Sequence, residues 1–356
     1  MGDPEPSDVD ALVVLSPPHP VVRVYKRRWY LLIVYCLIGF WQADIWNLYG
    51  PLAESLKAAY PDHWADETTA MMGNWAVILY LPLFLPTVWA ALRFGLRVSI
   101  GLALYSTAIA CFIRIFSESP QAFVWTAHVG SLLNGCCGVI AVSLIPAFSA
   151  TWFPPSQRTS ATAILQTANQ MGVAGSFFFS NLFVPDPAEV PSKQDEMLQR
   201  SDLNRYFCFN AIISLVLLVI FLTYFPSSPS LPPSHSSSAE VAEDRPTLRE
   251  SCKTLLRSRP FWLLALSFSS AQGVLGVWMS VLDISVEPLK VDQHLSDWLG
   301  VCAVFGQVVV TNISSAVCDR FSGHLKQVAL TLLCLSVGFY VWFSLLIVGV
   351  APYSSG

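Results

Sequence analysis

Charged residues are scarce in this sequence, and their scarcity narrows the class of protein to which it can belong. Asp, Glu, Lys and Arg together account for 12% of the 356 residues, whereas hydrophobic residues account for 54%. An average soluble domain carries about twice that charged share. The mean hydropathy of +0.53 is higher than a water-soluble domain with one hydrophobic core would have. We therefore predict an integral membrane protein, whose length is best counted in spans of about 20 residues.

Several functional motifs are missing as well. The sequence contains no HExxH zinc motif, no phosphate-binding loop and no Ser-His-Asp arrangement typical of a hydrolase. Its net charge of −4 argues against a nucleic-acid partner. None of the nine cysteines forms a C-x-x-C pair, so we interpret them as small membrane hydrophobes. The sequence thus predicts neither an enzyme nor a protein that holds a cofactor, a metal or nucleic acid.

The apolar residues are arranged in nine long runs, which predict nine transmembrane helices in an all-α polytopic membrane protein. The runs cover residues 29–53, 69–92, 98–116, 121–150, 158–184, 204–225, 260–288, 297–317 and 326–350. Residues 1–22 have no signal-peptide core, and we expect them to form a disordered cytoplasmic tail. With the N-terminus in the cytoplasm, most lysines and arginines fall on cytoplasmic loops, as the positive-inside rule requires. Arg114 is among the few that this topology places outside.

Residues 226–259 separate the first six runs from the last three. The segment begins with PSSPSLPPSHSSS and ends in a basic amphipathic stretch. Because a stretch so rich in proline and serine cannot pack a core, we predict a cytoplasmic linker. The linker divides an N-terminal six-helix bundle at 23–225 from a partial C-terminal bundle of three helices at 260–356.

Five segments of the sequence carry a resemblance to a known family. They are VYKRRWYLL (24–32), WQADIWNLYGPL (41–52), LLNGCCG (132–138), ATWFPPSQRTSATAI (150–164) and GVLGVWMSVLD (273–283). Together they resemble solute carrier family 49, the feline leukaemia virus subgroup C receptor-related transporters, and most of all its disrupted in renal carcinoma 2 branch. The resemblance implies the major facilitator superfamily fold, in which two six-helix halves surround a central site. A complete member has three further spans, so we expect this chain to be a truncated form that ends outside.

The first span offers polar and aromatic candidates for a solute site. Gln42, Trp46 and Tyr49 share one helical face by their spacing, whereas Asp44 points roughly to the opposite side. The resemblance implies that the aromatic residue at Trp46 contacts substrate, and an indole face can attract a cation. The alternative is that Trp46 is an interfacial or packing residue.

The fifth span carries a polar stripe on an otherwise apolar helix. Its members are Thr162, Gln166, Asn169, Gln170 and Val173. The resemblance implies that Gln170 contacts substrate, and we add Gln166, Asn169 and, on the fourth span, Asn134 as candidates. An amide offers both a donor and an acceptor to a hydroxyl or an amine. The alternative is that the stripe forms hydrogen bonds between helices.

Two acidic residues lie within predicted spans and are candidates for coupling. A carboxylate near the bilayer centre costs about 2.5–3.5 kcal/mol on insertion scales, which favours protonation or pairing. Asp44 could therefore couple transport to protons, neutralise a cationic solute, or pair with a neighbouring polar group. Asp283 lies near the outer end of the seventh span and could equally be an interfacial residue.

The resemblance also implies charged gates at two cytoplasmic loops. WAALRFGLR (89–97) keeps Arg93 and Arg97 of the superfamily pattern, but Leu92 stands where an aspartate is expected. CDRFSGHLK (318–326) keeps Asp319 and Arg320. We therefore expect an asymmetric gate that depends mainly on the second copy.

The resemblance implies a secondary transporter of a small organic nutrient in the lysosomal membrane, with a pyridoxine-like solute. We expect either a uniporter or a symporter coupled to H⁺. DVDALVVL (8–15) approximates an acidic dileucine sorting signal. Gly276 replaces the tyrosine that helps to cage choline in relatives, which weakens the case for a quaternary ammonium solute. Choline, ethanolamine or haem transport at the plasma membrane is the alternative. A second alternative is a truncated isoform that transports nothing and acts as a scaffold or dominant negative.

Overall fold

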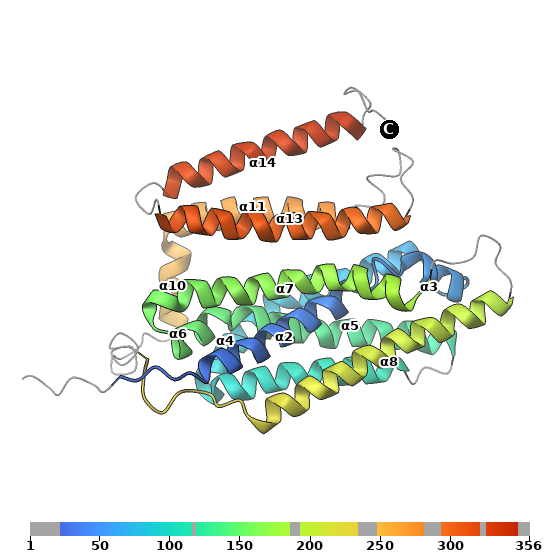
Figure 1. The fold of residues 1–356 in the computed structure, drawn as a ribbon, viewed down its shortest axis with the longest axis horizontal. Coiled ribbons are helices and arrows are strands. Elements are labelled where there is room, and N and C mark those ends of the chain that lie inside the picture. Colours follow the sequence, from blue (N-terminus) through green and yellow to red (C-terminus); the bar gives the residue numbers. More distant parts are fainter. Residues whose placement is uncertain are drawn as a thin grey trace, which may run out of the picture.

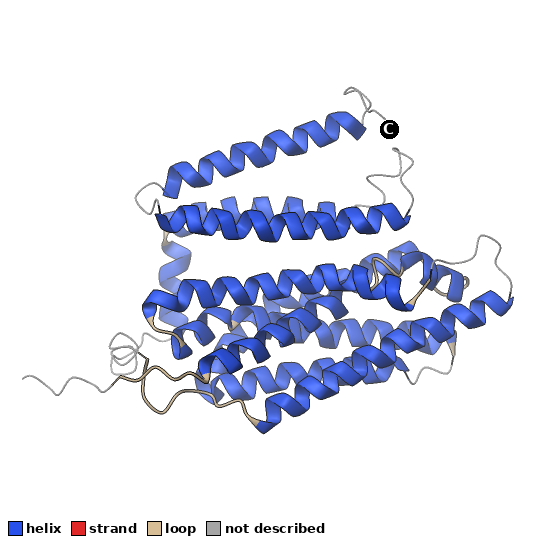
Figure 2. Ribbon diagram, in the orientation of Figure 1, coloured by secondary structure: helices blue, strands red, loops and turns tan. Residues whose placement is uncertain are grey.

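The computed structural model describes residues 22–115, 119–185, 193–233, 248–280, 293–320 and 325–347, and the regular structure within these ranges is helical (Figure 2). The helices are α2 (Arg28–Asn47), α3 (Ala53–Ala59), α4 (Asp66–Ile115), α5 (Pro120–Ser143), α6 (Ile145–Trp152), α7 (Pro155–Phe183), α8 (Lys193–Thr223), α10 (Leu248–Arg257), α11 (Arg259–Ser280), α13 (Gln293–Arg320) and α14 (Leu325–Ile347). Among the described residues, the helices long and apolar enough to cross a membrane include α2, α4, α5 and most of α8. The prediction of an all-α protein is confirmed for this part of the chain.

Helix α2 is shorter than the apolar run that predicted it. The run extends to residue 53, but the helix ends at Asn47. Asn47 turns its side-chain amide back to the carbonyl of Ala43, and the Gly50 amide bonds to the Asn47 carbonyl in a tight turn. Pro51 follows and removes the amide that would continue the helix. The apolar residues beyond this turn belong to the short helix α3, which packs against α8.

Helix α4 contains two of the predicted spans, 69–92 and 98–116, joined at Gly95. Gly95 has φ of 82°, a left-handed conformation that suits glycine. Ala76 and Thr107 would be about 46 Å apart on one straight helix. Both nevertheless meet the middle of α5: Thr107 donates to Asn134, and a Cβ on Gly135 would lie 3.0 Å from the Ala76 Cα. The chain therefore reverses at Gly95, and the two legs pack side by side on α5.

The fourth predicted span, 121–150, is two helices in the structure. Helix α5 ends at Ser143 and α6 begins at Ile145. Pro146, the second residue of α6, has no amide hydrogen to extend the ladder of α5. The break is compatible with membrane burial because the Leu144 amide still bonds to the Ile140 carbonyl.

Small residues bring α2 and α7 into close contact at the centre of the bundle. A Cβ on Gly172 would clash with the backbone carbonyl of Phe40, and one on Gly175 would lie 2.8 Å from the Phe40 ring. Gly39 faces Asn169 across the same interface. Small residues on one helix commonly allow a neighbouring membrane helix to approach this closely.

Helices α11, α13 and α14 form a second group beside the first six spans (Figure 1). Helix α13 packs against α7. The described side chains of α14 are almost all exposed, whereas the main buried cluster lies among the helices before residue 226. The division into halves by a linker at 226–259 remains a prediction, because residues 234–247 lie outside the described part.

Candidate functional site

Three of the candidate amides meet between α2, α5 and α7. The Asn134 amide group donates to the backbone carbonyl of Gln42 (3.2 Å). The Asn169 amide group donates to the Gly39 carbonyl (3.0 Å) and lies 3.5 Å from Gln42 Oε1. Gln42 and Asn134 are 2% and 1% exposed. These hydrogen bonds between helices fit the structural alternative, but Gln42 Nε2 is buried without a hydrogen-bond partner in the described residues.

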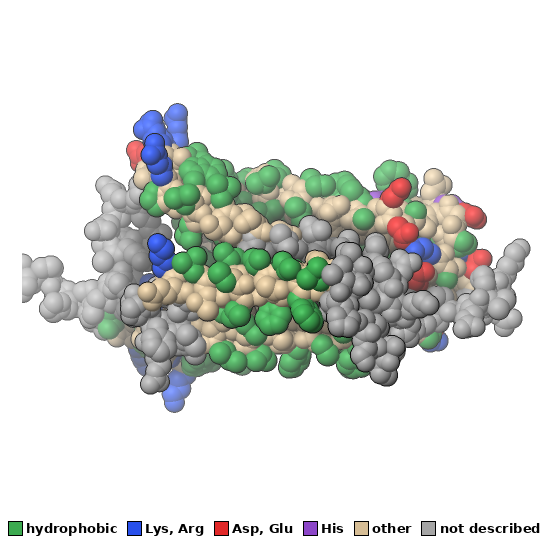
Figure 3. Space-filling view, turned by 90° about the horizontal axis from the view of Figure 1, so that it is seen from above, with side chains coloured by type: hydrophobic (Ala, Val, Ile, Leu, Met, Phe, Trp, Pro, Cys, Tyr) green, Lys and Arg blue, Asp and Glu red, His purple; other side chains and the backbone are tan. Residues whose placement is uncertain are grey.

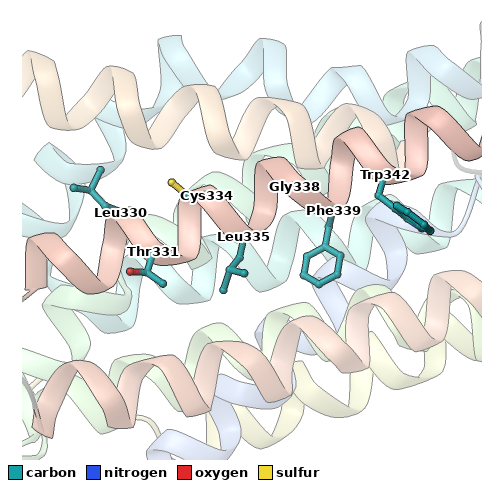
Figure 4. Close-up of a pocket in the computed structure, with 7 residues that line it drawn as sticks. All are labelled: Leu330, Thr331, Cys334, Leu335, Gly338, Phe339 and Trp342. Atoms are coloured by element: carbon teal, nitrogen blue, oxygen red, sulfur yellow. The ribbon is translucent and has the colours of Figure 1, made fainter. Parts of the chain in front are cut away.

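The space beside this amide network is small. A void of about 10 Å³ adjoins Asn169 and Gly39, which is room for about one water molecule. A larger hollow of about 820 Å³ lies elsewhere (Figure 4). All its lining residues belong to one helix, α14, and only Thr331 among them has a hydroxyl: Leu330, Thr331, Cys334, Leu335, Gly338, Phe339 and Trp342. A solute site is usually enclosed and has several convergent polar groups, so we do not assign it to this face.

Trp46 is the most accessible of the solute-site candidates on α2. Its side chain is 37% exposed, and its indole N–H donates to the Gly73 carbonyl on α4 (3.1 Å). Gln170 is half-buried on α7, and Gln166 is exposed one turn before it. The structure therefore brings Gln42, Asn134 and Asn169 together and leaves Trp46 partly exposed on α2.

Asp44 lies on another side of α2, deep between α7 and α8. Its side chain is fully buried, and the Tyr206 hydroxyl donates to its Oδ2 (3.4 Å). Its Oδ1 faces Gly175 and has no hydrogen-bond partner within the described residues. The chain of polar contacts continues along α8, where the Ser214 hydroxyl lies 3.5 Å from the Cys111 sulfur on α4.

Arg114, which the predicted topology assigns to the outer side, is a buried cation in the last turn of α4. The side chain is 2% exposed, its guanidinium carbon lies 5.3 Å from the centre of the Tyr49 ring, and Nη2 donates to Ser131 (3.5 Å). Gly130 makes room for it, because a Cβ there would lie 2.5 Å from Arg114 Nε. The sequence feature that indicates this burial is the position of Arg114 inside the third apolar run, one turn after Cys111.

Asp44 and Arg114 are therefore an acidic and a basic side chain that are both buried inside one bundle. Within the described residues, neither belongs to an ion pair closer than 4.0 Å. Burying a charged group without an ion-pair partner costs free energy. A proton or a solute that changes the charge at Asp44 therefore also changes the electrostatic free energy of Arg114.

The candidate gating residues lie at the end of the bundle opposite Arg114. The structure describes the side chains of only some of them. Arg97 donates to the Leu222 carbonyl at the end of α8 (3.3 Å), and its backbone amide donates to Ser227. Arg93 is exposed and stacks on Trp89. Both arginines thus contact their own half. Asp319 and Arg320 end α13, and their side chains lie outside the described residues, as does Asp283.

The distribution of charge at the two ends agrees with the predicted orientation. Lys and Arg side chains gather at the end of the molecule that holds α10, and most of the visible Asp and Glu side chains lie at the other end (Figure 3). Among the described residues, no three His, Cys, Asp or Glu side chains are placed to hold a metal.

Comparison with known proteins gives one consistent family. The profile described as Major Facilitator Superfamily matches residues 31–355. The solute carrier family 49 member 4 homolog of Xenopus laevis is 31% identical over 91% of this chain and 70% of its own length. The choline/ethanolamine transporter flvcr2a of Danio rerio is 24% identical over 90% of this chain and 67% of its own length.

Solved structures with the same fold are more distant in sequence. The xylose transporter XylE from E. coli, in a partially occluded inward-open conformation, gives a TM-score of 0.54 at 16% identity over 83% of this chain and 74% of that one. A bacterial homolog of the human lysosomal transporter Spinster gives 0.59 at 15% identity over 85% of this chain and 64% of that one. At these identities the likeness concerns the fold.

Proposed function

We propose that this chain, which belongs to solute carrier family 49 of the major facilitator superfamily, carries a pyridoxine-like nutrient across the lysosomal membrane. It is a multi-pass membrane transporter and not an enzyme. The observation that carries the substrate proposal is the partial exposure of Trp46, which lies one turn beyond Gln42, whose side-chain Nε2 has no hydrogen-bond partner in the described residues. A flat heteroaromatic ring with hydroxyl groups can stack on the indole and bond to amides. The lysosomal address is supported by the sorting-like segment at 8–15.

The substrate proposal is tested by uptake of a labelled panel of B6 vitamers, choline, ethanolamine and haem precursors. The panel is given to cells that overexpress the chain, and to lysosomes isolated from them. We expect pyridoxine accumulation or release to change at the lysosome, and the Trp46→Ala variant to lose that change. Trp125→Ala is the matched control, because Trp125 is a 66% exposed tryptophan at the other end of α5 from the gate. Transport of choline alone would contradict the proposal.

The second candidate is a choline- or ethanolamine-like cation at the plasma membrane. Relatives in the same family bear that function in their names, and an indole face attracts a desolvated cation by about 2 kcal/mol. The uptake panel separates the two, because a cation would be carried at the cell surface and would compete with choline. We place it second because glycine stands at position 276.

We further propose that Asp44 couples transport to protons. Its buried carboxyl touches Tyr206 and is not on the Trp46 side of α2, so it is better placed to bind a proton than to touch solute. Asp44→Asn should abolish the pH dependence of uptake and retain solute affinity. Asp62→Asn, in an exposed loop, is the control. Loss of affinity with intact pH dependence would instead assign Asp44 as a counter-charge to the solute.

A further inference from the structure

The short helix α10 differs from the long helices in direction. It runs across the end of the molecule, roughly perpendicular to α11 and α13 (Figure 1). The long helices follow the membrane normal in a protein of this fold, so α10 lies in the plane of the membrane surface. Its end of the molecule is the one where Lys and Arg side chains gather (Figure 3), which the positive-inside rule assigns to the cytoplasm.

The residues of α10 are sorted by face. Arg249, Lys253 and Arg257 recur every four residues and form one basic stripe, and all three are exposed. Leu255 and Leu256 belong to the adjoining apolar face and are 48% and 60% exposed. Helices of this kind, with leucines beside a cationic stripe, lie at the interface of a bilayer.

The corner between α10 and α11 holds this face at the membrane boundary. The Trp262 indole N–H, on the first turn of α11, donates to the Leu256 carbonyl at the end of α10 (2.9 Å). Ser258 completes the corner, because its amide bonds to the Leu255 carbonyl and its hydroxyl accepts from the Phe261 amide. Since α11 begins at Arg259, the leucines of α10 sit where a membrane span leaves the bilayer.

The three basic side chains of the stripe outnumber Glu250, the one acidic residue of α10. None of Arg249, Lys253 and Arg257 takes part in an ion pair with the described part of the chain. The cytoplasmic arginines near α2 differ, because Arg27 donates to Tyr224 and Arg28 stacks on Phe153. The cytoplasmic leaflet is rich in anionic lipid, which attracts basic segments next to a membrane span.

We propose that α10 is a lipid-binding helix that docks on anionic phospholipid headgroups of the cytoplasmic leaflet. Its basic stripe contacts the headgroup phosphates, and Leu255 and Leu256 enter the boundary with the acyl chains. The contact anchors the end of the 226–259 segment and the start of α11. It is separate from the solute site and does not depend on which solute is carried.

The full chain is placed in nanodiscs of phosphatidylcholine, with or without phosphatidylserine, and hydrogen exchange of residues 248–257 is followed by mass spectrometry. We expect exchange to be several-fold slower in the anionic discs, and the difference to shrink at high salt. The variant R249Q/K253Q/R257Q should lose the difference. The variant R249K/R257K keeps the charge and should retain it.

Native mass spectrometry of the same samples gives a second readout, in which the neutral variant should retain fewer phosphatidylserine molecules than the charge-preserving one. Equal exchange in the two kinds of disc would overturn the proposal. Slowing that occurs only after cytosol is added would also overturn it, because an acidic protein would then be the partner. Exchange across α2 and α7 serves as an internal check that each variant is folded.

Discussion

At the scale of single residues, the burial of Arg114 depends on the absence of a side chain at position 130. A methyl group on Gly130 would lie 2.5 Å from Arg114 Nε and 3.0 Å from the Ala110 carbonyl. Gly130→Ala should therefore displace the guanidinium and destabilise the protein by about 1–3 kcal/mol, as overpacking does. The unfolding midpoint in detergent measures the effect. Gly306→Ala is the control, because nothing lies within 4 Å of the Cβ position of Gly306. Equal unfolding midpoints for the two variants would contradict the prediction and show that the packing around Arg114 can accommodate the added methyl group.

The sequence predicted which side chains face the bundle interior where this depends on spacing along one helix. It did not predict burial that depends on packing between helices. Spacing predicted that Asn169 lies on the inner stripe of its helix, and the structure places it against Gln42. The same stripe included Gln166, which is exposed. The burial of Arg114 was not predicted, although Arg114 lies inside the third apolar run, because it depends on Gly130 and Tyr49 from other parts of the chain. Proximity of that kind is a property of the fold and cannot be obtained from spacing along one helix.

At the scale of helices, the reversal of α4 depends on the conformation of Gly95. With φ of 82° the position is strained for any residue with a side chain, at about 1–2 kcal/mol. An added Cβ would also lie 3.3 Å from the Ser227 hydroxyl, which accepts from the Arg97 amide. Gly95→Ala should therefore lower the unfolding midpoint, and Gly338→Ala, on an open face of α14, should not. A Gly95→Ala variant as stable as the parent protein would mean that the turn between the legs can form without a left-handed residue.

Element boundaries show why hydropathy predicts the existence of a span better than its ends. The long apolar runs correspond to helices, but α2 stops at Asn47 and the fourth run divides at Leu144. In both cases a proline and local hydrogen bonds end the helix within an apolar run. A hydropathy profile detects neither the effect of the proline nor these hydrogen bonds. The predicted linker differs in kind, because its composition excludes a packed core without any knowledge of neighbouring helices.

At the scale of the whole molecule, the orientation in the membrane makes a direct prediction for protease accessibility. The 226–259 segment should be cleaved from the cytosolic face before any other loop, at sites before α10, because that part is long, polar and rich in proline. The loop at 60–65, which contains the exposed Asp62, should be cleaved only from the opposite face. Sealed vesicles of known orientation provide the measurement. Protection of 226–259 on the cytosolic side would contradict the arrangement of two bundles joined by a cytoplasmic linker.

The central claim is that the N-terminal bundle recognises a flat, hydroxyl-bearing solute through the partly exposed Trp46 and through side-chain amides, of which the family resemblance implies Gln170. Equilibrium binding of labelled pyridoxine to the purified chain tests this claim most directly. Trp46→Ala should weaken binding by about 1–2 kcal/mol through loss of the ring face, and Gln170→Ala by about 1–3 kcal/mol through loss of a desolvated hydrogen bond. Trp125→Ala and Gln121→Ala, at exposed positions of α5, should bind as the parent chain does. Undiminished binding by the Trp46→Ala, Gln170→Ala double variant would contradict the account and leave both residues as packing.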